Sequence, residues 1–169
     1  MGDTAWKAVS AVLTWLVLGT TTMGVAVAES PVRGMARIID GDSLEVSGRT
    51  FDLVGVDAPE LLQRCLFRDR LYDCGAISRT ALMDLTAGTE VECRPLPGAA
   101  QETVAHCTAG GYDLSEGMVY TGWALAQRDS ATTRYRKFET TAADAKHGLW
   151  RGVFLTPWNW REGERLPQE

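Results

Sequence analysis

Residues 38–60 form the stretch that most restricts how this chain of 169 residues can fold. Two turn dipeptides, Asp40-Gly41 and Ser47-Gly48, separate short apolar runs, a pattern typical of tight turns between strands. The apolar positions of a partly buried sheet fall on Leu44, Val46, Phe51, Leu53 and Val56. The stretch therefore predicts two or three short strands joined by tight turns.

Three acidic residues lie at the breaks between these strands. Asp42 ends the first turn, and Asp57 and Glu60 lie where the last strand runs into a proline. Two carboxylates and a nearby carbonyl suit a hard, oxygen-seeking cation such as calcium, and a third carboxylate could act as a general base on bound water. The alternative is that these acids are ordinary turn residues with no chemical role.

Residues 40–43 read Asp-Gly-Asp-Ser, and residues 56–60 read Val-Asp-Ala-Pro-Glu. This pair of motifs resembles the staphylococcal-type thermonuclease family, which has Asp-Gly-Asp-Thr and, later, Gly-Ile-Asp-Ala-Pro-Glu. Gly-Leu-Trp at 148–150 is similar to the end of that family's last helix. The resemblance covers roughly residues 34–152 and implies an α+β fold, a five-stranded OB-type β-barrel with about three packed helices.

The resemblance also implies roles for individual residues. The two aspartates that hold calcium in the family fall on Asp42 and Asp57, and a backbone carbonyl ligand would come from Ala58. The general base falls on Glu60. In such a site the ion polarises the phosphate, the base directs water, and positive donors stabilise the developing charge.

The two arginines that clamp the phosphate in the family fall on Asp52 and Glu102, so both are replaced by acids. An arginine fork binds phosphate through charge-assisted bonds, whereas a carboxylate repels the same oxygens. Losing one transition-state donor costs on the order of a hundredfold to a thousandfold in rate. The sequence therefore predicts a catalytically defective protein with a binding or accessory role. The alternative is a calcium-dependent nuclease or phosphodiesterase acting on DNA or RNA, with Arg49, Arg64 or Arg68 as replacement donors.

The net charge of the chain and its resemblance to exported bacterial proteins indicate which partners to expect. The net charge is -5 and the pI about 5.1, so the basic footprint of a nucleic-acid binder is missing overall. Nucleic acid is expected as a partner only under the nuclease alternative, and the chain is expected to be a monomer that does not dock on membranes. Some exported bacterial proteins resembling this fold are encoded with exopolysaccharide genes, including succinoglycan genes, which suggests one accessory role; no residue indicates a sugar-binding site.

Residues 1–28 predict an export signal. Lys7 ends a short n-region, residues 8–18 form an apolar h-region, and Ala-Val-Ala at 26–28 is a cleavage pattern. The alternative is an uncleaved anchor helix, which needs about 20 apolar residues and is interrupted here by three threonines. Cleavage would leave a single domain, residues 29–169, in the periplasm or outside the cell.

All four cysteines follow the predicted cleavage site, and an even number in an oxidising compartment favours disulfides. We expect the pairs Cys65–Cys74 and Cys93–Cys107, because the second pair ends two strand-like runs that could lie side by side. The alternative is a zinc site, but no Cys-x-x-Cys spacing is present and the chain has two histidines.

Three helices are predicted in the rest of the chain. They span 75–86 with Asp73 as N-cap, 114–121 with a capping box from Asp113 to Glu116, and 133–147. An aromatic tail follows, formed by Trp150, Phe154, Trp158 and Trp160. We expect the tail to pack on the barrel, the alternative being contact with a cofactor or carbohydrate.

Overall fold

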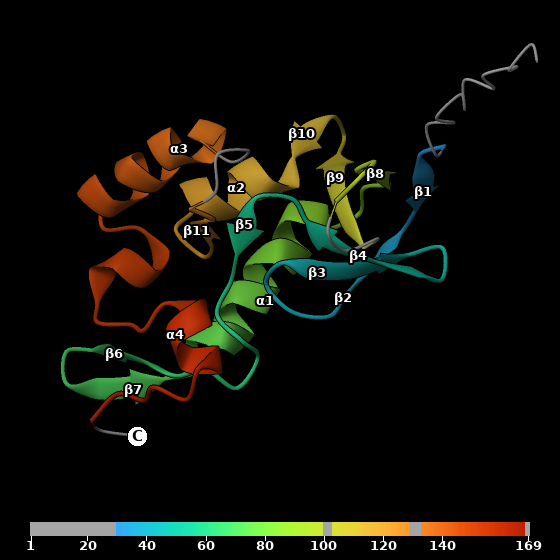
Figure 1. The fold of residues 1–169 in the computed structure, drawn as a ribbon. Coiled ribbons are helices and arrows are strands. Elements are labelled where there is room, and N and C mark those ends of the chain that lie inside the picture. The colour runs from blue at the N-terminus through green and yellow to red at the C-terminus, as the bar shows by residue number, and fades with distance from the viewer. Residues whose placement is uncertain (1–29, 100–102, 129–132, 168–169) are drawn as a thin grey trace, which may run out of the picture.

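The structure is a computed structural model that describes residues 30–99, 103–128 and 133–167 (Figure 1). The described part contains a seven-stranded sheet, two two-stranded ladders and four α-helices, so the predicted α+β class is confirmed. The predicted export signal, residues 1–28, and Glu102 lie outside the described residues.

The large sheet runs in the order β1-β8-β9-β4-β3-β2, with β10 paired to β9. Its strands are β1 (Val32–Gly34), β2 (Ala36–Ile38), β3 (Ser43–Val46), β4 (Arg49–Leu53), β8 (Val91–Pro95), β9 (Val104–Ala109) and β10 (Tyr112–Asp113). All pairs are antiparallel except β4 with β9.

The sheet differs from the prediction in its strand number and its closure. It has seven strands rather than five, and within the described ranges no ladder joins β1 to β2, so a closed barrel is not shown. Met35 alone separates β1 from β2, and these two short strands pair with different partners, β1 with β8 and β2 with β3.

The predicted turns of the 38–60 stretch are present. Oδ1 of Asp40 accepts hydrogen bonds from the backbone N–H of Asp42 at 3.1 Å and of Ser43 at 2.7 Å, which closes the first turn. Ser47 and Gly48 both have positive φ, as a two-residue hairpin turn requires. Because side chains alternate along a strand, β3 and β4 then bury their predicted apolar positions, Leu44, Val46, Phe51 and Leu53.

The helices α1 (Cys74–Thr86), α2 (Leu114–Tyr120) and α3 (Thr133–Asp144) lie close to their predicted positions. Asp73 is the N-cap of α1, but its side chain makes no capping bond. Asp113 caps α2 by accepting from the backbone N–H of Glu116 at 3.2 Å. Helix α3 ends before the predicted residue 147, and Lys146 has φ +54°, a conformation that cannot continue a right-handed helix.

Both predicted disulfides are confirmed, and the described residues include no free cysteine. Cys93 and Cys107 lie directly opposite each other in the β8–β9 ladder. Cys65 and Cys74 join a hairpin, β6 (Cys65–Phe67) and β7 (Arg70–Tyr72), to the first residue of α1. Two disulfides are typical of an extracellular or periplasmic protein.

The C-terminal tail packs on the domain, as predicted, through a 3-10 helix, η2 (Gly148–Arg151), and a short helix, α4 (Pro157–Arg161). Val153 and Leu66 exchange two backbone hydrogen bonds of 2.8 Å. In Figure 1 the hairpin and α4 lie at the opposite end of the fold from β1. No helix in the described ranges has both the length and the apolar composition for crossing a membrane.

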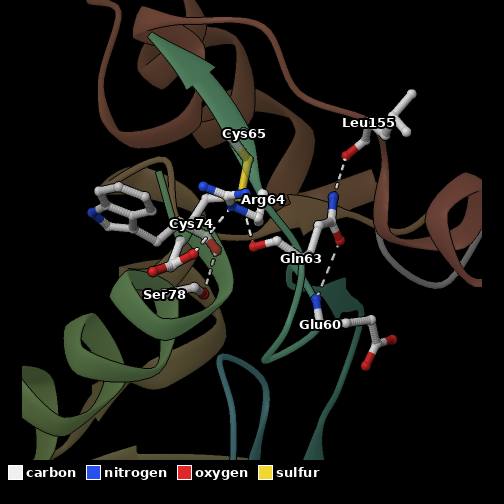
Figure 2. Close-up of a disulfide and its surroundings, with 9 residues drawn as sticks. Glu60, Gln63, Arg64, Cys65, Cys74, Ser78 and Leu155 are labelled. Carbon is white, nitrogen blue, oxygen red and sulfur yellow. Dashed lines mark hydrogen bonds and ion pairs between the residues drawn. A yellow bond between two sulfur atoms is a disulfide. The ribbon is translucent and has the colours of Figure 1, made fainter. Parts of the chain in front are cut away.

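A buried glutamine connects the tail to the rest of the chain. Gln63 is fully buried, and Figure 2 shows it between Glu60 and Leu155, beside the Cys65–Cys74 disulfide. Its Nε2 donates to the carbonyl of Leu155 at 2.7 Å, and its Oε1 accepts from the backbone N–H of Glu60 at 3.2 Å. A buried amide satisfied in this way fixes the tail against the loop that carries Glu60.

Candidate functional site

An acidic pocket of about 380 Å³ opens beside β3, β4 and β5 (Val56–Asp57), the last of which pairs with β11 (Leu125–Ala126). Its charged lining consists of Asp40, Asp42, Asp52, Asp57, Glu60 and Arg161. The structure therefore brings together every predicted site side chain that it describes. Five carboxylates of this pocket face one arginine, which the sequence analysis did not single out.

The turn that carries Asp42 is tied to both β5 and α1. Oδ2 of Asp42 accepts a hydrogen bond from the backbone N–H of Ala58 at 2.8 Å, which links the turn to the residue after β5. A Cβ atom on Gly41 would lie 2.0 Å from Oγ of Ser78 and 2.6 Å from the Ala58 side chain. Glycine is therefore needed at position 41 so that the acidic turn can sit against α1.

Asp52, at one of the predicted arginine positions, is held by hydroxyl groups. Its Oδ1 accepts from Ser43 at 3.0 Å, across the β3–β4 ladder, and its Oδ2 accepts from Thr103 at 2.5 Å. An ionised carboxylate accepts hydrogen bonds but donates none. This corner of the pocket therefore stabilises a negative charge of its own and offers no donor to an incoming anion.

Arg161, the last residue of α4, reaches into the pocket from the tail. Its Nη1 and Nη2 donate to the two carboxylate oxygens of Asp57 at 2.9 and 2.6 Å, and its Nη1 also donates to Glu60 at 2.7 Å. Asp57 is only 7% exposed, so this fork neutralises a buried charge. The bonds to Asp57, followed by those to Glu60, raise the pKa of Arg161 further above its ordinary value.

The ligand set predicted for calcium does not fit an ion as it is arranged here. Calcium takes six to eight oxygen ligands, yet both oxygens of Asp57 bind Arg161 and one oxygen of Asp42 binds the N–H of Ala58. Burial, and then the charge of Asp40, raise the pKa of Asp42, which disfavours the ionised form. In the part of the chain that the structure describes, no group of three or more metal-binding side chains is found. Calcium binding stays a prediction, and it would require displacement of Arg161.

The three arginines considered as replacement donors lie elsewhere. Arg49 covers the ring of Phe51 at 5.2 Å, Arg64 pairs with Asp73 at 3.4 Å, and Arg68 covers the ring of Phe67 at 5.1 Å. None of them lines the acidic pocket.

A sequence signal for Arg161 did exist. Thr156-Pro157 is a helix start, with Thr156 accepting from the N–H of Asn159, and it places Arg161 at the end of a single helical turn. The Thr-Pro pair predicts the short helix, but it does not predict that Arg161 binds Asp57.

The raised pKa of Asp42 leads to a pH-dependent prediction. A carboxyl group whose pKa is raised by folding stabilises the protein below its unfolded pKa, about 3.9, and this contribution is lost as the pH rises through the folded pKa. Asp42→Asn keeps an acceptor for the Ala58 N–H and removes the charge. We expect it to stabilise the fold by about 1 kcal/mol at neutral pH, the low end of the cost of burying a polar group, because Asp42 is only partly buried.

Thermal melts from pH 4 to pH 8 would measure the difference between variant and wild type, which should grow with pH. Asp84→Asn, at an exposed position of α1, is the matched control. A variant that is less stable than the wild type at neutral pH would contradict the prediction.

Comparison with known proteins found no matching family model. The chain is 32% identical over 156 residues to the succinoglycan biosynthesis protein ExoI of Rhizobium meliloti (strain 1021). The match covers 89% of this chain and 79% of that protein.

Proposed function

The chain belongs to the family of the succinoglycan biosynthesis protein ExoI, and on that premise we propose that it is a non-hydrolytic accessory or binding protein of exopolysaccharide biosynthesis. Its two disulfides favour action in the periplasm or outside the cell. The observation that carries the non-hydrolytic part is the fork of Arg161 on Asp57, with its further bond to Glu60.

We infer a thermonuclease-like OB barrel as the scaffold. The segment β1–Met35–β2 pairs with β8 through its first half and with β3 through its second half. If this segment is counted as one bent strand and the two-residue β10 is set aside, five strands remain, and both ends of the sheet path are the same piece of chain. This arrangement supports a small, partly open barrel.

Two features of the acidic pocket disfavour phosphodiester hydrolysis. Glu60, at the predicted base position, accepts a hydrogen bond from Arg161, which occupies one of the oxygens that would have to direct water. Asp52, at a predicted donor position, is an acceptor fixed by two hydroxyls. A phosphate in this pocket would meet carboxylates where hydrolysis requires donors.

Two assays test the proposal. The purified protein is incubated with single-stranded DNA and calcium, with and without chelator, and we expect no calcium-dependent cleavage above background. In the host organism, deletion of the gene should lower exopolysaccharide yield, and both the wild type and Glu60→Gln should restore it. Robust cleavage by the wild type, together with loss of both activities in Glu60→Gln, would replace this proposal with the calcium-dependent nuclease.

A further inference from the structure

A second cavity, of about 480 Å³, lies between the β6–β7 hairpin, α1 and η2. We name it the arginine cleft, after Arg68 and Arg70 of the hairpin and Arg151 of η2, which line it with Phe67, Leu71, Tyr72 and Ile77. It shares no lining residue with the acidic pocket. The cleft therefore offers cationic groups from the hairpin and from η2. The Leu66–Val153 backbone bonds hold the hairpin to the chain just after η2, and the Cys65–Cys74 disulfide holds the hairpin to α1.

Two of the three cleft guanidinium groups, those of Arg68 and Arg151, lie over aromatic rings. Arg151 lies over the rings of Phe67, Tyr72 and Trp123, at 5.2, 5.5 and 5.7 Å from their centroids. Arg68 lies over Phe67 at 5.1 Å. Within the described ranges, none of the three cleft arginines forms an ion pair with a carboxylate. A guanidinium stacked on a ring keeps its N–H donors at its edge, in the plane that a carboxylate recognises.

A buried hydroxyl lies in the same place. The hydroxyl oxygen of Tyr72 is buried and makes no hydrogen bond of good geometry within the described residues. Burial raises the pKa of this hydroxyl, whereas the nearby guanidinium of Arg151 lowers it, so the two groups lie close together in the cleft. Arg68, Arg70 and Arg151 are exposed and form no ion pair with a carboxylate among the described residues, so they give this cleft a local positive charge in a chain of net charge -5.

We propose that the arginine cleft binds a carboxylate-bearing sugar unit of an acidic polysaccharide. The choice of a glycan as the ligand rests on the proposed function. The negative charge of the bound group rests on the arginines of the cleft. The arginine forks would receive the carboxylate in the plane of the guanidinium groups. The sugar ring would pack on Leu71 and on Ile77, a residue that is 36% exposed.

The cleft suits a carboxylated sugar better than a nucleic acid. Recognition of single-stranded nucleic acid relies on open aromatic faces for stacking and on a groove of cations that follows the backbone. Here the ring of Phe67 is covered by two arginines and the ring of Tyr72 by one. Three positive charges in one cavity match the charge of one or two carboxylates rather than the repeated phosphates of a nucleic-acid strand.

Titration calorimetry on the purified protein tests the proposal. The probes are a uronic-acid oligosaccharide, a neutral oligosaccharide of equal length, inorganic phosphate and a single-stranded DNA oligonucleotide. We expect the uronic-acid oligosaccharide to bind at least tenfold more tightly than each of the others, and its affinity to fall with added salt.

Two variants locate the binding. Arg151→Gln and Arg70→Gln should each weaken binding of the uronic-acid oligosaccharide about tenfold. Arg70 stacks on no ring among the described residues, so its variant reports on binding even where Arg151→Gln perturbs the fold. The control is Arg94→Gln, which removes a positive charge paired with Glu92 outside the cleft and should leave binding unchanged. Equal binding of the neutral oligosaccharide, an equal loss in Arg94→Gln, or tighter binding of DNA would overturn the proposal.

The cleft and the proposed function can fail separately. If gene deletion leaves exopolysaccharide yield unchanged while the cleft variants still weaken binding, the proposed function is wrong and the cleft stands. If yield depends on the gene but both cleft variants bind and restore yield like the wild type, the cleft is wrong and the function stands.

Discussion

Arg161→Met is expected to lower the melting temperature in calcium-free buffer and to make added calcium stabilising. The change removes a bidentate contact with Asp57 and one bond to Glu60. Breaking a buried ion pair costs about 3–5 kcal/mol, but the Arg161 side chain is 47% exposed, so solvent screening reduces the expected cost to about 2 kcal/mol. For a domain of this size that corresponds to roughly 5–10 °C.

The calcium response follows from the same contacts. Without Arg161, Asp57 and Glu60 would face Asp42 with no cation between them, and a bound ion would relieve their repulsion. Binding to the folded state alone then raises the melting temperature through linkage. In the wild type the fork already neutralises Asp57, so millimolar calcium should have little effect.

Melts with chelator and with millimolar calcium would measure both effects. Arg165→Met is the matched control, because Arg165 lies in the same tail and stacks on Trp160 at 4.1 Å outside the acidic pocket. Arg161→Lys separates charge from geometry, since lysine keeps the charge but cannot form the fork. If the wild type is stabilised by calcium as strongly as Arg161→Met, an ion can displace the arginine and the calcium site predicted from the sequence is supported.

The parts of the fold that could be predicted from the sequence are those set by local chemistry. The Asp40 turn needs a carboxylate and a glycine within a few residues. In β3 and β4, which follow the turn, apolar and polar residues alternate, and this alternation predicts which side chains are buried. Cys93 and Cys107 lie in two short strand-like runs that pair with each other in one hairpin. Asp42 and Asp57 converge because a turn and a strand end meet at the same side of the sheet.

The parts that could not be predicted depend on contacts distant in the sequence. Arg161 is separated by 104 residues from Asp57, and no periodicity connects them. Its position follows from the path of the tail, which is fixed by backbone bonds at Leu66 and by the buried Gln63. Lys146 has a left-handed backbone conformation, so α3 ends earlier than expected. The apolar periodicity of the sequence did not predict this conformation either.

The tail is the element that the two candidate sites share. It contributes Arg161 to the acidic pocket and Arg151 to the arginine cleft. In the acidic pocket Arg161 binds carboxylates of the chain itself. In the arginine cleft Arg151 contacts aromatic rings and pairs with no acid among the described residues. The positive charge of Arg161 is therefore compensated by carboxylates of the chain, whereas that of Arg151 can still bind an external anion.

Removal of the Cys93–Cys107 disulfide is expected to have the largest effect on stability. The bond closes a loop with a sequence separation of 14, and the chain-entropy model gives about 3 kcal/mol for a loop of this length. Both cysteines are fully buried in the main core, so alanine is the suitable replacement. Melts of Cys93→Ala/Cys107→Ala should show a decrease of roughly 10 °C. A variant that melts within a few degrees of the wild type would show that the ladder alone fixes these strands.

Cys65→Ala/Cys74→Ala is the informative comparison, because its loop, with a separation of 9, should cost nearly as much in the same model. Its consequences should nevertheless lie elsewhere. These cysteines form a second core cluster with Leu149, against which Tyr72, Trp123 and Phe154 pack, and this cluster supports the hairpin of the arginine cleft. We therefore expect faster amide hydrogen exchange in β6 and β7, and weaker binding of the uronic-acid oligosaccharide, in this variant only. If both disulfide variants bind it equally, the cleft does not depend on the bond that joins the hairpin to α1. If only this variant loses binding, the oxidising compartment is needed for the ligand site as well as for the fold.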